Sequence, residues 1–170
     1  MFNRFVRDSR VLVDQAQQIA RSLGSSTVEA EHLLLAFTDR AGTKAHDLLI
    51  NAGLDRDAVR DALDAENESS LAAVGVSRGE FALPAAKATA QAPRWAASAK
   101  LALERSLKIA LARGDHRIEA AHILLAVLDA KFGTVPRALA IAGVEPERLA
   151  RLVEIRGFAP RPIRARESRV

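Results

Sequence analysis

The feature that most constrains the fold of this chain is an internal repeat with a period of 90 residues. Shifting the 170-residue sequence by 90 positions aligns residues 14–63 with residues 104–153 without a gap. The segment VEAEHLLLAF at 28–37 returns as IEAAHILLAV at 118–127. Because self-similarity at a fixed period marks a duplicated structural unit, we expect two matched halves. Two copies are too few for a solenoid, so we expect one compact body in which a pseudo-twofold axis relates the halves.

Each half is predicted to be helical, because Tyr is absent and good helix formers dominate. An apolar stripe at helical spacing runs along the first helix through Leu12, Ala16, Ile19, Ala20 and Leu23. Gly24 follows at the position where a glycine ends a helix. Ser26 with Glu29 three residues later fits a capping box, so a second helix is predicted from near Ser26 to about Asp39.

Two further helices complete the unit. The third is predicted over 44–52, where Gly53 ends it, and the fourth runs from a cap at Asp55 through Leu63. In the second copy Pro146 takes the corresponding first-turn position. Four helices per copy predict an all-α protein of about eight helices.

The segment 64–93 between the copies is first polar and then rich in Gly, Pro and small residues, which is typical of a linker. Phe81 and Leu83 are apolar, so part of the linker is expected to pack back onto the body. Trp95 is expected to anchor the start of the second copy. The predicted organisation is a double repeat over 1–155, with the first copy at about 1–63, the second at about 94–155, and a tail at 156–170.

Composition narrows the class of protein. The chain has no Cys, which excludes disulfides, Cys-type zinc sites and thiol catalysis. The charged N-terminus is followed by no apolar signal region, and no apolar run approaches the roughly 20 residues that span a bilayer. These features predict a soluble cytoplasmic protein.

The net charge of +4 and the pI of about 10.1 come from the tail. There a single acidic residue, Glu167, faces five basic residues, which are Arg156, Arg161, Arg164, Arg166 and Arg169. The body is therefore neutral overall, and its charge does not indicate a nucleic-acid partner. A regulatory protein that binds nucleic acid through the tail remains an alternative.

The motifs of common enzymes are missing. The chain has no P-loop, no G-x-S-x-G and no H-E-x-x-H, so we predict a non-enzymatic protein without a cofactor. Glu29 and His32 stand three apart, as do Glu119 and His122, and two such pairs are also typical of ferritin-like di-iron proteins, to which Asp14 and Glu104 would add carboxylates.

We favour a structural explanation over the di-iron alternative, because each Glu-x-x-His pair falls in the first turn of a short helix. A carboxylate there favours the helix dipole or closes a capping box. The histidine is expected to be half-buried, with its ring hydrogen-bonded to neighbouring backbone. No metal site is predicted.

With these motifs in place, the chain resembles the N-terminal domain of the Clp unfoldases, most of all the ClpC type. The elements that carry the resemblance in the first copy are Phe2-x-Arg4-Phe5, Ala16-Gln17, Leu23-Gly24, Glu31-His32-Leu33-Leu34-Leu35 and Ala52-Gly53-Leu54. Those in the second copy are Ala99-Lys100, Gly114, His122-Ile123-Leu124-Leu125 and Ala142-Gly143-Val144. The resemblance covers residues 1 to about 155 and implies an eight-helix receptor domain, here expected to stand alone without ATPase modules.

The resemblance also implies a binding site. In ClpC-type domains the glutamate before the motif histidine helps to recognise phosphoarginine as a degradation mark, and Glu31 holds that place in the first copy. In the second copy the place is taken by Ala121, which cannot accept hydrogen bonds from a guanidinium. The family's threonine after the opening Phe is replaced by Val6, and Ala96 lies at the comparable place. At most one phosphoarginine site is therefore expected.

A second candidate surface is one face of the first helix. Arg10, Val13 and Gln17 follow at i, i+3 and i+7, away from the apolar stripe, and Phe2 borders them. The family uses this face for peptide-like ligands and adaptors. We therefore predict a module of the Clp proteolysis system that binds substrates, tags or adaptors, or competes with the Clp unfoldase for them.

Overall fold

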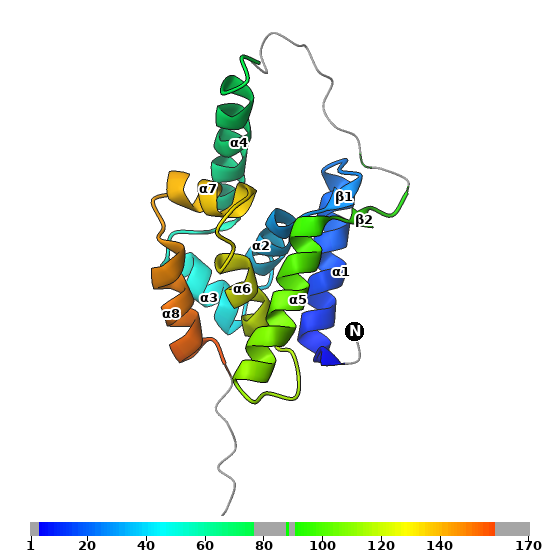
Figure 1. The fold of residues 1–170 in the computed structure, drawn as a ribbon, viewed down its shortest axis with the longest axis vertical. Helices are drawn as coiled ribbons and strands as arrows, with labels where there is room; N and C mark the ends of the chain where they lie inside the picture. The colour runs from blue at the N-terminus through cyan, green and yellow to red at the C-terminus, as the bar shows by residue number, and fades with distance from the viewer. Residues whose placement is uncertain (1–3, 77–87, 89–90, 159–170) are drawn as a thin grey trace, which may run out of the picture.

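The computed structural model describes residues 4–76, 88 and 91–158, which form two halves of four helices each (Figure 1). The first half holds α1 (Arg7–Ser22), α2 (Ala30–Thr38), α3 (Lys44–Asn51) and α4 (Arg56–Ala72). The second half holds α5 (Ala97–Ala112), α6 (Ala120–Leu128), α7 (Thr134–Ile141) and α8 (Pro146–Arg156). Each helix of the second half begins 90 residues after its counterpart, so the predicted all-α double repeat is confirmed.

Short backbone pairings join the halves and show the pseudo-twofold relation. Strand β1 (Thr27–Val28) pairs in parallel with β2 (Arg94–Trp95). Ninety residues on from Val28, Ile118 pairs in the same sense with Phe5, which is itself ninety residues before Trp95. In each half, the segment before the first helix therefore pairs with the segment before the second helix of the other half.

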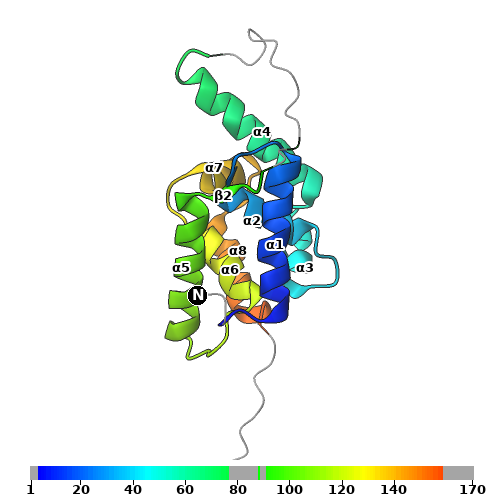
Figure 2. The same cartoon turned by 90° about the vertical axis from the view of Figure 1, so that its right-hand side faces the viewer.

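Helices α2 and α6 lie at the centre of the molecule. In the first half α1 packs on α2, and in the second half α5 packs on α6. The halves also pack across each other, with α4 on α7 and α3 on α8 (Figures 1 and 2). All of α2 except Glu31, and all of α6 except Ala120, is buried. Helices buried in this way are mostly apolar on all sides. Glu31 is the polar residue of α2 that reaches the surface, whereas His32 and Thr38 are buried.

The predicted helix ends are largely confirmed. Gly24 and its counterpart Gly114 both take φ 72° just after the first helix of each half, a conformation that only glycine adopts at low cost. The Asp55 carboxylate accepts the Ala58 amide at 2.8 Å and caps α4, and Pro146 is the first residue of α8.

Two element boundaries differ from the prediction. The second helix begins at Ala30 with Glu29 as its N-cap, and Ser26 is not the cap, because pairing with β2 holds β1 extended. Helix α4 runs past Leu63 to Ala72, because Glu66 is buried there and forms an ion pair with Arg137 of α7 at 2.6 Å. The predicted linker therefore begins as helix.

The described residues also revise the account of the termini. Trp95 is partly buried against the core, as expected of an anchor. Phe158, which the sequence placed in the tail, packs against the core as well. Phe2, Phe81 and Leu83 lie outside the described residues. Within the described part of the chain, no helix is both long and apolar enough to cross a membrane.

Candidate functional site

Glu31 is the only residue of α2 with appreciable exposure, and it stands among other acidic groups. Burial raises the pKa of its carboxyl group from 4.5 to about 7, and the negative charges of Glu29 and Glu66 add to the rise. A hydrogen bond from the Thr134 side chain acts in the opposite direction. No ion pair to Glu31 occurs among the described residues, so its negative charge is poorly compensated.

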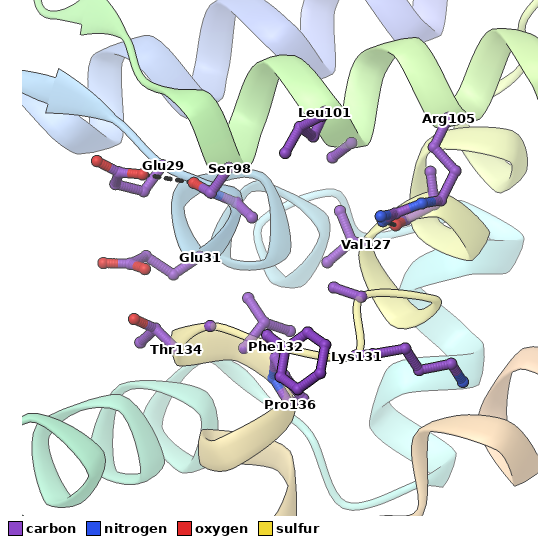
Figure 3. Close-up of a pocket in the computed structure, with 16 residues that line it drawn as sticks. Glu29, Glu31, Ser98, Leu101, Arg105, Val127, Lys131, Phe132, Thr134 and Pro136 are labelled. Atoms are coloured by element: carbon purple, nitrogen blue, oxygen red, sulfur yellow. Dashed lines mark hydrogen bonds between the residues drawn. The ribbon is translucent and has the colours of Figure 1, made fainter. Parts of the chain in front are cut away.

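A pocket of about 680 Å³ opens beside this carboxylate, between α2, α5 and the α6–α7 loop (Figure 3). We name it the Glu31 pocket. Acidic residues lie at one end and cationic Arg105 and Lys131 at the other, with a largely apolar wall between them. Phe132 in this wall is 93% exposed and Leu101 is 55% exposed. Large apolar side chains so exposed around a cavity are typical of an interaction surface.

A second pocket of about 570 Å³ lies against α4 and shares Glu31 and Thr134 with the first. We name it the α4 pocket. Its acidic residue Glu66 is held by Arg137 at 2.6 Å and by the Ser70 hydroxyl at 2.7 Å. Glu66 therefore has cationic compensation, whereas Glu31 between the two pockets does not.

The Glu-x-x-His pairs are helix caps. The Glu29 amide donates to Nδ1 of His32 at 2.9 Å, and the Glu119 amide donates to Nδ1 of His122 at 2.9 Å. Burial lowers the pKa of both imidazoles, which favours the neutral ring that can accept at Nδ1. The predicted bond from ring to backbone is confirmed, but both histidines are fully buried, not half-buried.

This arrangement does not fit the di-iron alternative. Nδ1 of each histidine is occupied by a backbone amide, and the Glu29 carboxylate accepts the hydroxyls of Thr27 and Ser98. Asp14 and Glu104, which would complete such a site, are exposed. Across the described ranges, no three His or acidic residues come together as metal ligands.

The structure excludes one residue from the proposed face of the first helix and leaves the role of the others a prediction. Val13 is 3% exposed and belongs to the core, so its assignment to an exposed patch was wrong, because α1 buries a broader stripe than the sequence suggested. Arg10 is exposed and its Nε donates to the Phe5 carbonyl at 3.1 Å. Gln17 is partly buried and donates to the Pro93 carbonyl at 3.4 Å.

Sequence reasoning nominated Glu31 as a binding residue but did not nominate Phe132, Thr134 or Glu66, which line the pockets beside it. The counterpart of Phe132 in the first half is Gly42, so a search for unlike pairs between the halves would have drawn attention to this loop. Glu66 was hidden because it lies in a segment that was taken for a linker.

Fold and site together define an all-α double-repeat domain with an acidic, partly apolar surface pocket. The chain belongs to the Clp repeat (R) N-terminal domain family, whose sequence model matches residues 4–96 and 94–156. The predicted resemblance is therefore confirmed for both copies. No curated protein gives a significant match.

Solved structures show the same fold at low sequence identity. The N-terminal domain of the chaperone ClpD from Arabidopsis thaliana superposes with a TM-score of 0.67 at 20% identity, covering 91% of this chain and 95% of that one. The Hsp104 N-terminal domain from Candida albicans gives 0.60 at 18%, covering 88% of each chain. The N-domain of ClpV, solved in complex with a VipB peptide, gives 0.58 at 18%, covering 88% and 84%.

Proposed function

We propose that this chain is a non-enzymatic protein-binding module of the Clp proteolysis system, which captures a substrate segment, a phosphoarginine-type tag or an adaptor in the Glu31 pocket. The observation that carries the proposal is the poorly compensated carboxylate of Glu31 at the junction of two pockets. The fold supports the general role, because Clp N-domains bind substrates and adaptors.

A cationic group is the natural ligand for such a carboxylate. Burial and the charges of Glu29 and Glu66 destabilise its negative charge, which is why the pKa of Glu31 rises to about 7. A guanidinium placed beside it would relieve this repulsion and could form a bidentate, charge-assisted pair. Recognition of arginine, modified or not, would therefore depend on Glu31.

The rest of the pocket suits a peptide around that cation. The wall formed by Leu101, Val127 and Phe132 would cover the methylene stem of the arginine and a neighbouring apolar residue. Arg105 and Lys131 line the far end, where each pairs with a carboxylate of the chain and would attract an acidic side chain of the bound peptide. A phosphoryl group bonded to the guanidinium itself would lie at the Glu31 end, beside the hydroxyls of Ser98 and Thr134 (Figure 3).

The proposal implies one tag site per chain, because Ala121 offers no acceptor in the second half. It also implies competition: a Clp unfoldase that recognises the same segment could not bind it at the same time. Both roles need binding alone and no ATP hydrolysis.

Calorimetric titration with a phosphoarginine peptide and with its arginine counterpart tests the proposal. The wild-type protein should bind the phosphorylated peptide at one site, and Glu31→Ala should weaken binding by about tenfold or more, which is the usual loss for a charge-assisted contact. Glu68→Ala, which removes an exposed carboxylate of α4, is the matched control and should bind like wild type. Equal binding by wild type and Glu31→Ala, or binding by neither, removes the tag proposal. Equal affinity for both peptides removes the phosphate part of it.

A further inference from the structure

In the second half, the chain itself fills a pocket. The ring of Phe158 lies 4.7 Å from the imidazole of His122, measured between ring centroids and tilted by 58°. The guanidinium carbon of Arg113 lies 3.7 Å from the centroid of the same ring, which is a cation–π geometry. Phe158 thus sits in a niche whose walls are cationic and aromatic.

This niche is the pseudo-twofold counterpart of the α4 pocket. In the first half, that pocket is lined by Leu23, Ser25, Glu31, His32 and Thr134, among others. The residues 90 positions away are Arg113, Asp115, Ala121, His122 and Lys44. Arg113, His122 and Lys44 contact Phe158 directly. Asp115 contacts both Arg113 and His122, and Ala121 lies against Gly157, the residue before Phe158. The open pocket of one half is therefore a filled pocket in the other.

Lys44 binds the backbone of Phe158. Its Nζ donates to the Phe158 carbonyl at 2.6 Å. Lys44 is the first residue of α3, and its counterpart Thr134 is the first residue of α7 and bonds to Glu31. The first residue of this helix therefore binds Phe158 of the same chain in one half and Glu31, beside the open pocket, in the other.

Local sequence explains why, among the described residues, a ring fills the pocket of the second half and none fills that of the first. Helix α4 continues to Ala72, whereas α8 stops at Arg156 and the chain turns at Gly157. A Cβ on residue 157 would lie 2.5 Å from the Val153 carbonyl oxygen and 3.3 Å from the Cβ of Ala121. The turn therefore requires glycine at 157 and a small side chain at 121, where the first half has Glu31.

We propose that the second half carries an aromatic-binding pocket, built by Arg113, Ala121, His122 and Lys44, whose resident ligand is Phe158 of the same chain. The pocket binds an aromatic side chain through cation–π and ring contacts, and Lys44 donates a hydrogen bond to the main-chain carbonyl of that same residue. Because Phe158 follows α8 within two residues, its effective concentration at the pocket is high, and the pocket is closed to ligands in trans. This inference does not depend on the function proposed for Glu31.

Removal of the resident ring should open the pocket to the same ligand supplied in trans. The probe is the capped synthetic peptide RGFAPRPI, which copies residues 156–163, and its matched control is RGSAPRPI. In calorimetric titration, full-length Phe158→Ala should bind the Phe peptide at least about tenfold more tightly than wild type does and than it binds the Ser peptide, because the two peptides share their arginines and only a ring makes the pocket's contacts. Val74→Ala, which shortens an exposed apolar side chain that lines neither the Glu31 pocket nor the α4 pocket, should behave like wild type.

Two results would overturn the proposal. One is that Phe158→Ala, shown to be folded by circular dichroism, binds the Phe peptide no better than wild type or binds both peptides equally. The other comes from the wild-type protein and does not depend on any variant: nuclear Overhauser effects between the rings of Phe158 and His122 are expected at a 4.7 Å separation, and their absence would show that the pocket is not filled.

Discussion

Replacing Glu31 by glutamine should stabilise the protein at alkaline pH and have little effect on its stability in acid. The carboxyl group has a pKa of about 7 in the folded chain, because of burial and the charges of Glu29 and Glu66, against an ordinary value of 4.5. A group whose pKa is raised on folding contributes stability that is fully present below 4.5 and is lost as the pH rises through about 7. Glutamine keeps the hydrogen bond to Thr134 but never carries the charge.

The magnitude follows from the size of the pKa change. Each tenfold change in an acid constant is worth about 1.4 kcal/mol, so a rise from 4.5 to about 7 sets an upper bound of about 3 kcal/mol. Glu31 retains some solvent contact, which screens its charges, so the expected gain at pH 8 is about 1–2 kcal/mol. For a chain of this length that gain corresponds to a rise in Tm of about 2–8 °C.

Urea unfolding of wild type and Glu31→Gln at pH 4.5 and pH 8 measures this difference directly. The two proteins should have nearly the same free energy of unfolding at pH 4.5 and should separate at pH 8. Glu68→Gln, on the exposed face of α4, is the control and should follow wild type at both pH values. The electrostatic argument would be refuted if Glu31→Gln changed the free energy of unfolding by the same amount at both pH values. It would also be refuted if Glu31→Gln were less stable than wild type at pH 8.

Three further predictions concern the caps and the turn that closes the second half. Gly157→Ala should lower the free energy of unfolding by about 1–3 kcal/mol in urea titration, because the added Cβ meets the Val153 carbonyl oxygen at 2.5 Å; an unchanged midpoint would contradict the tight turn. Asp55→Ala should cost about 1 kcal/mol in the same assay through loss of the cap on Ala58, and an unchanged midpoint would show that the cap contributes nothing. In a Glu31→Gln background, stability should rise with pH below about 6.5, because burial lowers the pKa of His32 and His122 on folding, and the rise should be smaller when His122→Gln is added; a slope of the opposite sign would contradict neutral imidazoles.

The repeat made most of the fold predictable from sequence. A period of 90 residues fixed the pairing of the helices, and capping signals such as Asp55 and Pro146 marked where several of them begin. The capping signal at Ser26 misled, because a strand pairing with residues far along the chain overrides local preference there. Such a pairing joins the two halves and leaves no trace in either copy alone.

Sequence reasoning could nominate site residues only at positions that are alike in the two repeats or that match the motif of the family. Glu31 was nominated because the family resemblance marks the glutamate before the motif histidine. The rise in its pKa comes from burial and from Glu29, and also from Glu66, which pairs with Arg137 of α7. Phe158 was assigned to a basic tail because it lies in a Pro-containing segment rich in arginine, whereas its burial depends on Arg113 and His122, which lie far away in the sequence. Contacts that differ between the halves therefore lay beyond a repeat-based argument.

The central claim is that the two halves share one fold but offer partners one open acidic site, at Glu31. Backbone amide shifts of the full-length protein, followed by NMR during titration with a phosphoarginine peptide, test it most directly. We predict saturable one-to-one shifts at Glu31, Ser98 and Thr134, with none at the counterparts Ala121 and Lys44. Saturable shifts of equal size in both halves, or no saturable shift at Glu31, would contradict the account.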